Sequence, residues 1–506
     1  MTTRGASLLC GLAVLAPGAF ATIHYWRAGL SLAHYDARAH LVVARRIFDS
    51  LTPGWQQVGA VWLPLPHLLD ALPVQSEWLY RTGASGIAIS MLSMVLAAWA
   101  IARLIHGATG SLTGGLVATA LLMLDPDVLY LQSTPMTEPL LFATTFLAVA
   151  LIAEWSASFD GTAPRASTRG AGWACIAAVL TRYEAWPIVA TAIALAFVVL
   201  VRRGVPTSAA FRAVRGLALW PLWAIAAYLV NSKVTVGSWF VDSGFFVADN
   251  PALGHPWLAW TQIWHGLIEL TGTALPWVAV IAAVGLVASA FPPSLKLRRT
   301  SRPNDFEDRS SLLLVLSLAA CAALPWAAYV KGHPVRIRYD VPLVAAAAAL
   351  AGTGVALLPR RARPVAGTLV VALAVWQAPP FQAQSPVVDE SQREAAQQRG
   401  REAVTAYLRS HWDGQPIMMS MGSLAHYMHD LSRDGFAIRD FLHEGNGEIW
   451  KHAVVRPAPY VEWIAIEGYA EGGDALHWQA EHDENFLRGF ERVAAGGNVT
   501  LYRRMR

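Results

Sequence analysis

The sequence is poor in charged residues and in cysteine. Asp, Glu, Lys and Arg make up 15% of its 506 residues, whereas a soluble protein carries roughly a quarter. The three cysteines, Cys10, Cys175 and Cys321, all lie in apolar segments, which excludes a disulfide framework or a cysteine-based zinc site. No internal repeat stands out. Hydrophobic residues, in contrast, reach 55% and the mean hydropathy is +0.38, so much of the surface is expected to face lipid.

Long apolar stretches recur from the N-terminus to about residue 380. A helix that crosses a bilayer needs roughly 20 mostly apolar residues. We therefore predict a mainly α protein, a polytopic transmembrane helical bundle with about eleven spans. Residues 6–26 could pass for a signal peptide, but no clean cleavage site follows, so they are assigned to the first helix. The predicted spans are approximately 6–28, 86–107, 112–131, 139–157, 171–186, 187–201, 216–232, 269–291, 311–329, 341–358 and 365–380.

Three of the loops between these spans are short, basic and poor in acidic residues. By the positive-inside rule these loops are cytoplasmic. The same rule accounts for the net charge of +4, so we expect no nucleic-acid partner. The predicted location is the bacterial inner membrane, with the N-terminus cytoplasmic and residues 29–85, 132–138, 233–268 and 330–340 outside. The basic residues are Arg202, Arg203, Arg212 and Arg215, then Lys296, Arg298, Arg299 and Arg302, then Arg360, Arg361 and Arg363.

The composition changes at the end of the apolar region, which divides the chain into a membrane domain, 1–380, and an extracytoplasmic domain, 381–506. The second part is polar, carries ordinary charge and has a usual domain size. We predict that it is a soluble α/β domain. Its helix is expected over about 389–411, and its strands near 416–420, 461–467 and 498–503.

The first outward loop, 29–85, contains an acid where the first helix leaves the membrane. An ionisable group at that depth is costly unless it has a partner or a function. On a helix, Asp36 and His40 share one face, and could orient a general base or supply two ligands to a divalent metal such as Mg or Mn. The alternative is an Asp36 that caps a helix beginning at Ala37. The loop closes with Trp-Leu-Pro-Leu-Pro-His, which contains Trp62 and His67.

Three further outward segments carry charge. Glu138 falls at the N-terminal end of an apolar helix, where the helix dipole also favours a carboxylate. Arg182 and Glu184 lie between two spans and could simply pair with each other. Segment 331–340 is basic on the side where basic residues are disfavoured. In an extended segment its Arg336 and Arg338 would share one face, suited to binding a phosphate, with Lys331 nearby; attraction to anionic lipid headgroups is the alternative.

These segments resemble those of the C-type (GT-C) membrane glycosyltransferases, in particular the protein O-mannosyltransferase and aminoarabinose transferase group. The resemblance rests on the Asp36 loop, the Trp-Leu-Pro-Leu-Pro-His element, Met-Thr-Glu-Pro, Leu-Thr-Arg-Tyr-Glu and Arg-Tyr-Asp-Val-Pro-Leu. It covers residues 1–380. It implies that Asp36 is the catalytic acid, that Glu138 is a second acid or metal ligand, and that Arg336 and Arg338 bind phosphate. Several such families have Asp-Glu in this loop, whereas here Ala37 follows Asp36.

The leading hypothesis is an inverting transfer of a sugar from a polyprenyl-phosphate donor to an extracytoplasmic acceptor. Asp36 would be the general base, helped by His40, and Glu138 would orient the acceptor or bind a metal. Arg336, Arg338 and Lys331 would hold the donor phosphate, while Arg182, Glu184, His67 and Trp62 would support the site. Two alternatives are a transporter or flippase of lipid-linked molecules, with its charges near the bilayer midplane, and a non-catalytic cell-envelope scaffold, whose loop acids would point to solvent.

Overall fold

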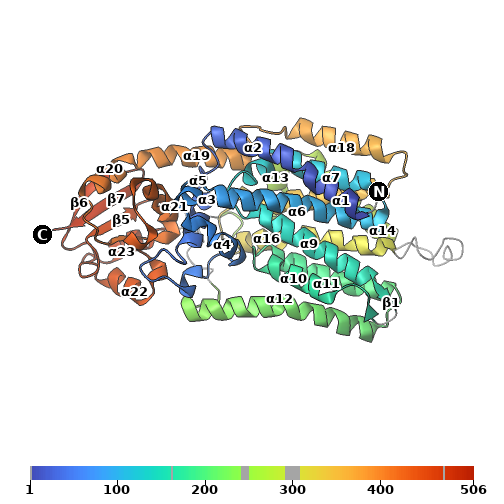
Figure 1. Ribbon diagram of the computed structural model, residues 1–506, viewed down its shortest axis with the longest axis horizontal. Coiled ribbons are helices and arrows are strands. Elements are labelled where there is room, and N and C mark those ends of the chain that lie inside the picture. The colour runs from blue at the N-terminus through green and yellow to red at the C-terminus, as the bar shows by residue number, and fades with distance from the viewer. Residues whose placement is uncertain (1–2, 161–162, 241–249, 291–307, 471–472, 506) are drawn as a thin grey trace.

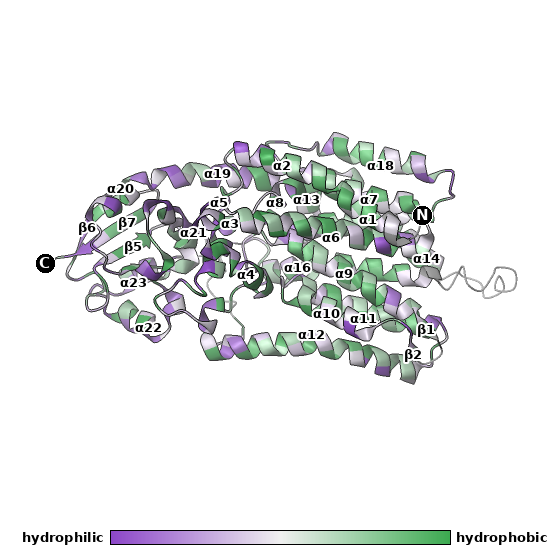
Figure 2. Ribbon diagram, in the orientation of Figure 1, coloured by the Kyte–Doolittle hydropathy of each residue, from purple (hydrophilic) through white to green (hydrophobic). Residues whose placement is uncertain are grey.

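The computed structural model describes residues 3–160, 163–240, 250–290, 308–470 and 473–505. Helices form a long bundle, and a small α/β part lies at one end of it, opposite the end at which the N-terminus lies (Figure 1). Hydrophobic residues dominate the bundle helices, whereas α19 and α20 of the C-terminal part carry many hydrophilic ones (Figure 2). This division follows the change in composition along the sequence.

Seven helices of the described residues are long and apolar enough to cross a membrane, or up to eight if a bent pair is one span. The protein is therefore a polytopic membrane protein. These helical stretches are Ser7–Arg27, Ala84–Thr109 (α6), Glu138–Ala157 (α9), Ala185–Arg202 (α11), Thr207–Thr235 (α12), Ser310–Val330 and Ile337–Leu357. The bent pair is Pro256–Thr271 (α13) and Ala274–Ala290 (α14), which meet at 115°.

The number of candidate membrane-spanning helices differs from the predicted eleven because several apolar stretches form shorter or broken helices. The predicted span 112–131 is interrupted at Asp125, whose side chain caps the following helix. The predicted span 269–291 begins at the bend between α13 and α14. The helices involved are α1 (Thr3–Ala13), α2 (Leu15–Arg27), α7 (Leu112–Leu124), α8 (Pro126–Leu131), α10 (Thr168–Val179), η4 (Asp308–Ala322), α16 (Ala323–Val330), α17 (Val341–Leu357) and α18 (Arg363–Gln377).

Small residues allow the central helices to pack closely. A Cβ atom on Gly352 of α17 would lie 2.5 Å from the backbone oxygen of Gly114 in α7, so neither position has room for a larger side chain. Close backbone approach through small residues is typical of helix packing in membranes. The core of the bundle therefore runs along α6, α7, α9 and α17, and the N-terminal ends of α9 and α17 lie near each other.

The C-terminal part contains a five-stranded mixed sheet in the order β4-β3-β5-β7-β6. The predicted strands correspond to β3, β5 and β7, whereas β4 and β6 were not predicted. The predicted helix 389–411 is two helices, α19 and α20, which meet at Arg401. The elements are α19 (Pro386–Gly400), α20 (Glu402–His411), β3 (Ile417–Met419), α21 (Met421–Leu431), β4 (Phe441–Leu442), α22 (Glu448–Val455), β5 (Trp463–Glu467), α23 (Ala475–His482), β6 (Phe490–Gly496) and β7 (Val499–Arg504).

The loop 29–85 lies between the bundle and this sheet. Its helix α3 packs against α21, and the Asp49 carboxylate accepts the backbone N–H groups of Ile438 and Arg439 at 3.4 and 3.3 Å. On the bundle side, the Asp127 carboxylate accepts the Val387 N–H at 2.9 Å and so secures the start of α19. The loop elements are α3 (Tyr35–Arg45), η1 (Trp55–Val58), α4 (Leu65–Asp70), η2 (Pro73–Gln75) and α5 (Glu77–Thr82).

Candidate active site

Asp36 lies in the first turn of α3 and is buried. The helix begins at Tyr35, and its cap is His34, whose Nδ1 accepts the Asp36 N–H at 3.1 Å. The alternative in which Asp36 caps a helix beginning at Ala37 is therefore wrong, because the helix starts two residues earlier. Since His34 satisfies the backbone at this end, the Asp36 carboxylate is left to interact with other elements.

Arg338 joins Asp36 to Glu138. The guanidinium donates to the Asp36 carboxylate, and its Nε lies 3.6 Å from Glu138 Oε1. Burial by itself would raise the pKa of Asp36, but the Arg338 guanidinium, with His34 and His40 nearby, holds that pKa well below its ordinary range. The carboxylate is thus ionised at neutral pH. The structure brings together the three residues to which the sequence assigned base, acid and phosphate-binding roles.

Arg182 extends this charged cluster. Its guanidinium lies 3.0 Å from Glu138 Oε1 and 2.7 Å from Glu184 Oε1. It also donates to the Thr137 hydroxyl at 2.9 Å. Glu138 is fully buried, and neither of its carboxylate oxygens has a hydrogen-bond partner among the described residues, so the two arginines hold it by charge alone. The result is a chain of alternating charge: Asp36, Arg338, Glu138, Arg182, Glu184.

Arg336 contacts a different set of groups. It donates to the Tyr35 hydroxyl at 2.8 Å and lies 4.0 Å from the carboxylate of Glu390 in α19. The other oxygen of Glu390 is 3.6 Å from His34 Nε2. The predicted shared face of Arg336 and Arg338 rested on an extended segment, but residues Ile337–Asp340 form a 3-10 turn (η5), so the two arginines point to separate acids.

Glu390 and His34 were missed as site residues. His34 was visible in the same motif as Asp36, but nothing in the sequence distinguishes Glu390 from the neighbouring acids of a polar helix. Lys331 was predicted to bind phosphate. It is exposed, and among the described residues it forms no ion pair with the acids of the cluster. Its predicted role therefore rests on its position in the chain alone.

His40 is paired with His67 rather than with Asp36. The two rings share a hydrogen bond of 3.0 Å between His40 Nδ1 and His67 Nε2. Trp62 packs on both rings, with centroids 4.1 Å from His40 and 5.8 Å from His67. Burial, together with the Arg46 charge, lowers the pKa of His67 to about 3. Burial also lowers the pKa of His40 well below its usual value, and the neighbouring His67 adds to this effect. Both imidazoles are therefore neutral at pH 7.

The fit of the site to a divalent metal can be judged from its donor set. The described residues contain no group of three or more His, Cys, Asp or Glu side chains that could hold a metal ion. Asp36 and Glu138, the two predicted ligands, both contact Arg338, which holds the position between them that a cation would need. These two carboxylates alone do not form a metal site.

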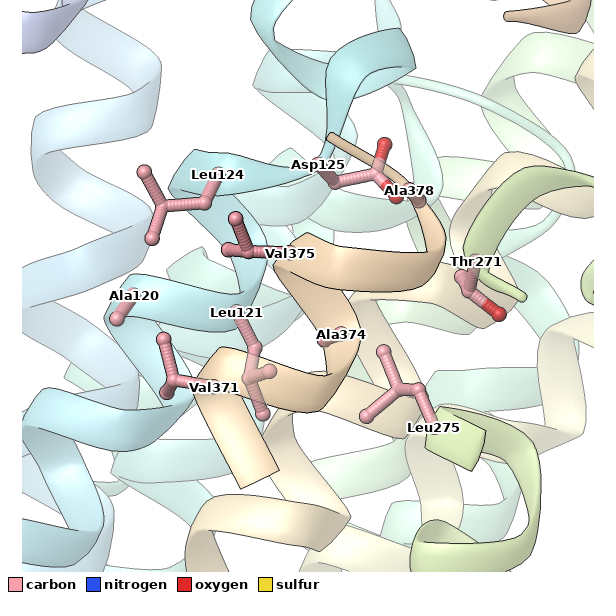
Figure 3. Close-up of a pocket in the computed structure, with 10 residues that line it drawn as sticks. All are labelled: Ala120, Leu121, Leu124, Asp125, Thr271, Leu275, Val371, Ala374, Val375 and Ala378. Atoms are coloured by element: carbon pink, nitrogen blue, oxygen red, sulfur yellow. The ribbon is translucent and has the colours of Figure 1, made fainter. Parts of the chain in front are cut away.

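An apolar hollow lies elsewhere in the bundle, between α7, α13, α14 and α18 (Figure 3). The space that it encloses is about 10 Å³, and its lining is alanine, leucine and valine apart from Asp125 and Thr271. None of the residues of the charged cluster lines it. The hollow adds no chemistry to the site.

Glu390 provides a pH-dependent test of the contact between α19 and the site. Burial raises its pKa, but His34 and the Arg338 and Arg336 charges outweigh burial and lower the pKa from 4.5 to about 2. Because the folded-state pKa is depressed, this carboxylate stabilises the fold above pH 4.5, and the stabilisation is lost as the pH falls towards 2. We expect Glu390→Gln to be less stable than wild type at pH 7 and to lose less stability over this range.

Thermal unfolding between pH 7 and pH 2 would measure this difference. Asp389→Asn is the matched control, since Asp389 is on the same helix but pairs with the exposed Arg393 at 3.2 Å. If both variants follow the same pH profile, the contact of Glu390 with His34 and Arg336 contributes no measurable stability.

The fold and the buried charged cluster together define a polytopic membrane protein with a composite site, built from the first loop, the ends of several bundle helices and the C-terminal part. No family model and no curated protein sequence matches this chain. The fold is similar to that of ArnT from Cupriavidus metallidurans bound to undecaprenyl phosphate, at 13% identity and a TM-score of 0.52, over 96% of this chain and 97% of that one. The apo structure of that ArnT gives 14% identity and a TM-score of 0.46, over 92% of each chain. At this identity the likeness concerns the fold.

Proposed function

We propose that the protein is a glycosyltransferase that moves one sugar from a polyprenyl-phosphate donor to an acceptor outside the cytoplasm. It would act in the bacterial inner membrane, with its N-terminus in the cytoplasm. The observation that carries the proposal is the buried contact between Asp36 and Arg338, which are 302 residues apart in the chain. A carboxylate and a guanidinium, placed together at the ends of membrane helices, supply the base and the phosphate-binding cation that sugar transfer requires.

In the proposed reaction, Asp36 takes the proton of an acceptor hydroxyl as that oxygen attacks the anomeric carbon of the sugar. The new C–O bond forms as the bond from the anomeric carbon to the phosphate oxygen breaks. The polyprenyl phosphate leaves with the bonding electrons, and attack from the opposite face inverts the configuration. Arg338 stabilises the negative charge on the leaving phosphate, as a guanidinium is well suited to do.

Arg338 would also control the basicity of Asp36. In the structure this guanidinium keeps the pKa of Asp36 low, which makes the carboxylate a weak base. When the donor phosphate takes over guanidinium N–H groups, the hold on Asp36 weakens and its pKa rises. Binding of the donor would then both raise the basicity of Asp36 and bring the leaving phosphate to Arg338. Arg336, and Lys331 by its position, would add positive charge on the donor side.

Glu138 is proposed to orient the acceptor. Arg182 and Glu184 support it, since Arg182 lies between the two carboxylates and fixes both. The solved structure of ArnT bound to undecaprenyl phosphate supports the donor class, because its fold extends over nearly the whole of this chain.

The two alternative functions predict other positions for these charges. A scaffold predicts loop acids that point to solvent, whereas Asp36 and Glu138 are buried against Arg338. A transporter predicts charges near the midplane of broken helices. Glu138 is the first residue of α9, and Arg338 lies in the turn before α17. Charges at helix ends favour transfer chemistry at the membrane surface.

Metal removal is expected to leave transfer intact. Arg338 already lies between Asp36 and Glu138 and supplies positive charge where Mg or Mn would act. Transfer measured in EDTA should therefore equal transfer in buffer, with added Mg²⁺ or Mn²⁺ as the reference. A loss of activity in EDTA that either metal restores would show that a divalent cation completes the site together with the donor.

The decisive experiment is to incubate the purified protein in nanodiscs with a panel of radiolabelled polyprenyl-phosphate sugars. We expect one donor class to give sugar transfer or, without acceptor, slow hydrolysis that releases polyprenyl phosphate. Asp36→Asn serves as the inactive control. If no donor of the panel is consumed, the glycosyltransferase proposal fails.

A further inference from the structure

A pocket lies beside the charged cluster, and neither Arg336 nor Arg338 lines it. The space that it encloses is about 20 Å³, enough for about one water, so a larger ligand would extend from it towards its open side. One wall is the segment 135–137, which directly precedes Glu138, and another is α3 at His40, one turn beyond Asp36. The remaining lining residues are Leu41, Pro66, His67, Asp70, Gly86, Ile89 and Leu140.

The pocket is in direct contact with the cluster. Met136 Sδ lies 3.7 Å from Arg338 Nη1, and the Thr137 hydroxyl accepts from Arg182. A molecule in the pocket would therefore lie beside the segment that leads into Glu138 and beside the face of α3 that carries Asp36. This is the position that an acceptor needs if Asp36 takes its proton.

Asp70 is the polar group of the pocket that the cluster does not use. It is 5% exposed, and its Oδ1 has no hydrogen-bond partner among the described residues. Burial raises the pKa of Asp70 to about 6, opposed by the nearby Ser85 hydroxyl. A buried acceptor atom without a partner costs free energy, and a ligand that donates a hydrogen bond would remove that cost.

The histidine pair offers one further acceptor and one donor. Two neutral imidazoles carry one proton each, and the hydrogen bond between His40 and His67 uses one of the two. The two nitrogens outside this hydrogen bond are His40 Nε2 and His67 Nδ1. Whichever ring donates the hydrogen bond, one of these two nitrogens carries a proton and the other a lone pair. His67 Nδ1 has no well-aligned hydrogen-bond partner among the described residues, although the Leu63 backbone lies close enough to raise the pKa of this ring.

The cations nearest to the pocket, Arg338 and Arg182, are already paired with carboxylates of the cluster. The lining of the pocket, within the described residues, contains no arginine or lysine. Arg46, whose charge helps to lower the pKa of His67, is directed elsewhere: it donates to the Gln57 carbonyl at 2.7 Å and to Met421 Sδ at 2.5 Å. A phosphate here would be desolvated beside the Asp70 carboxylate and would have to compete with the cluster's own acids for a cation, which is unfavourable.

We propose that this pocket is the acceptor subsite and that it takes an uncharged group with several hydroxyls, such as a sugar or another polyol, rather than an acceptor that bears a phosphate. The inference rests on the proposed glycosyltransferase function and divides the site in two. The donor phosphate belongs to the arginine side, and the acceptor hydroxyls belong to the side of His40, His67 and Asp70.

The test uses the full-length protein in nanodiscs and the variants Asp70→Asn and His67→Gln. Asparagine removes a buried charge that has no ion pair, so Asp70→Asn is expected to fold. Glu77→Gln is the matched control, because it removes one negative charge from the same loop outside the pocket. The exposed Glu77 pairs with Arg81 at 3.1 Å and with Arg45, which keeps Asp49 as a second acid in this variant. The probes are methyl hexosides and methyl pentosides, each alone and as its phosphate monoester.

We expect at least one uncharged glycoside to raise the unfolding temperature of the wild type, and Asp70→Asn to need roughly 10-fold more of it for the same effect. In the transfer assay, KM for the acceptor should rise by a similar factor in both pocket variants, with KM for the donor unchanged. Glu77→Gln should match the wild type, and the phosphate monoesters should neither stabilise the protein nor accept sugar.

Two outcomes overturn the inference while leaving the glycosyltransferase function standing: transfer with the same acceptor KM in wild type and pocket variants, or preference for the phosphate monoesters. Failure of the glycosyltransferase proposal while the pocket proposal stands would also be recognisable. Stabilisation by an uncharged glycoside that depends on Asp70, in a protein that neither transfers sugar nor hydrolyses any polyprenyl donor, supports the pocket and rejects the transferase.

Discussion

Asp36→Asn is expected to lower the rate of sugar transfer by roughly 100- to 10,000-fold, the usual contribution of a positioned general base. Asparagine has nearly the same shape and still accepts a hydrogen bond from Arg338, but it cannot take a proton. Arg338 also keeps its second acid, since its Nε remains close to Glu138. Transfer should thus be lost in a protein that still folds. The measurement is single-turnover transfer with saturating donor, together with the unfolding temperature.

Glu184→Gln is the control for this prediction. Glu184 is an equally buried acid at the far end of the same charged chain, but it contacts Arg182 and is not assigned to the chemistry. If general disruption of the network explained the loss in Asp36→Asn, Glu184→Gln would be impaired to the same extent. Full transfer by purified Asp36→Asn would rule out the base role and require another group to accept the proton.

Arg338→Ala is expected to have the largest effect on stability. Removing this guanidinium leaves the buried Asp36 and Glu138 carboxylates without a shared cation, and breaking a buried ion pair in this way costs about 3–5 kcal/mol. The variant should unfold at lower temperature and bind undecaprenyl phosphate weakly. The double variant Arg338→Ala with Asp36→Asn should recover part of the stability, because one of the uncompensated charges is gone.

Unfolding temperature and binding of undecaprenyl phosphate, both measured in nanodiscs, check this prediction. Arg336→Ala is the comparison, because Arg336 directly precedes the same turn and contacts Tyr35 and Glu390 rather than the two central acids. A smaller loss of stability is expected for Arg336→Ala. Equal stability of wild type and Arg338→Ala would mean that the carboxylates are not held by this charge.

The membrane fold could be predicted because apolar length is a local property of the chain. Stretches such as 86–107 and 139–157 correspond to α6 and α9 within a few residues. The breaks were harder to predict. Asp125 interrupts one apolar stretch by capping α8, and at the 115° bend between α13 and α14 the Gln377 side chain of α18 accepts the N–H of Ala274. Helix ends and bends are decided by partners that a window of sequence does not contain.

Composition and charge pattern alone determined that this is a membrane protein with a separate polar C-terminal part, and they singled out Asp36, Glu138, Arg182, Glu184 and Arg338 as charges in apolar surroundings. Only the tertiary structure decided how these charges pair. It placed Arg338 between Asp36 and Glu138, paired His40 with His67, and brought in Glu390 from α19. The physical reason is that a charged residue stands out in the sequence when its neighbours along the chain are apolar. The residue that compensates its charge, in contrast, can come from any element that the fold brings within contact distance.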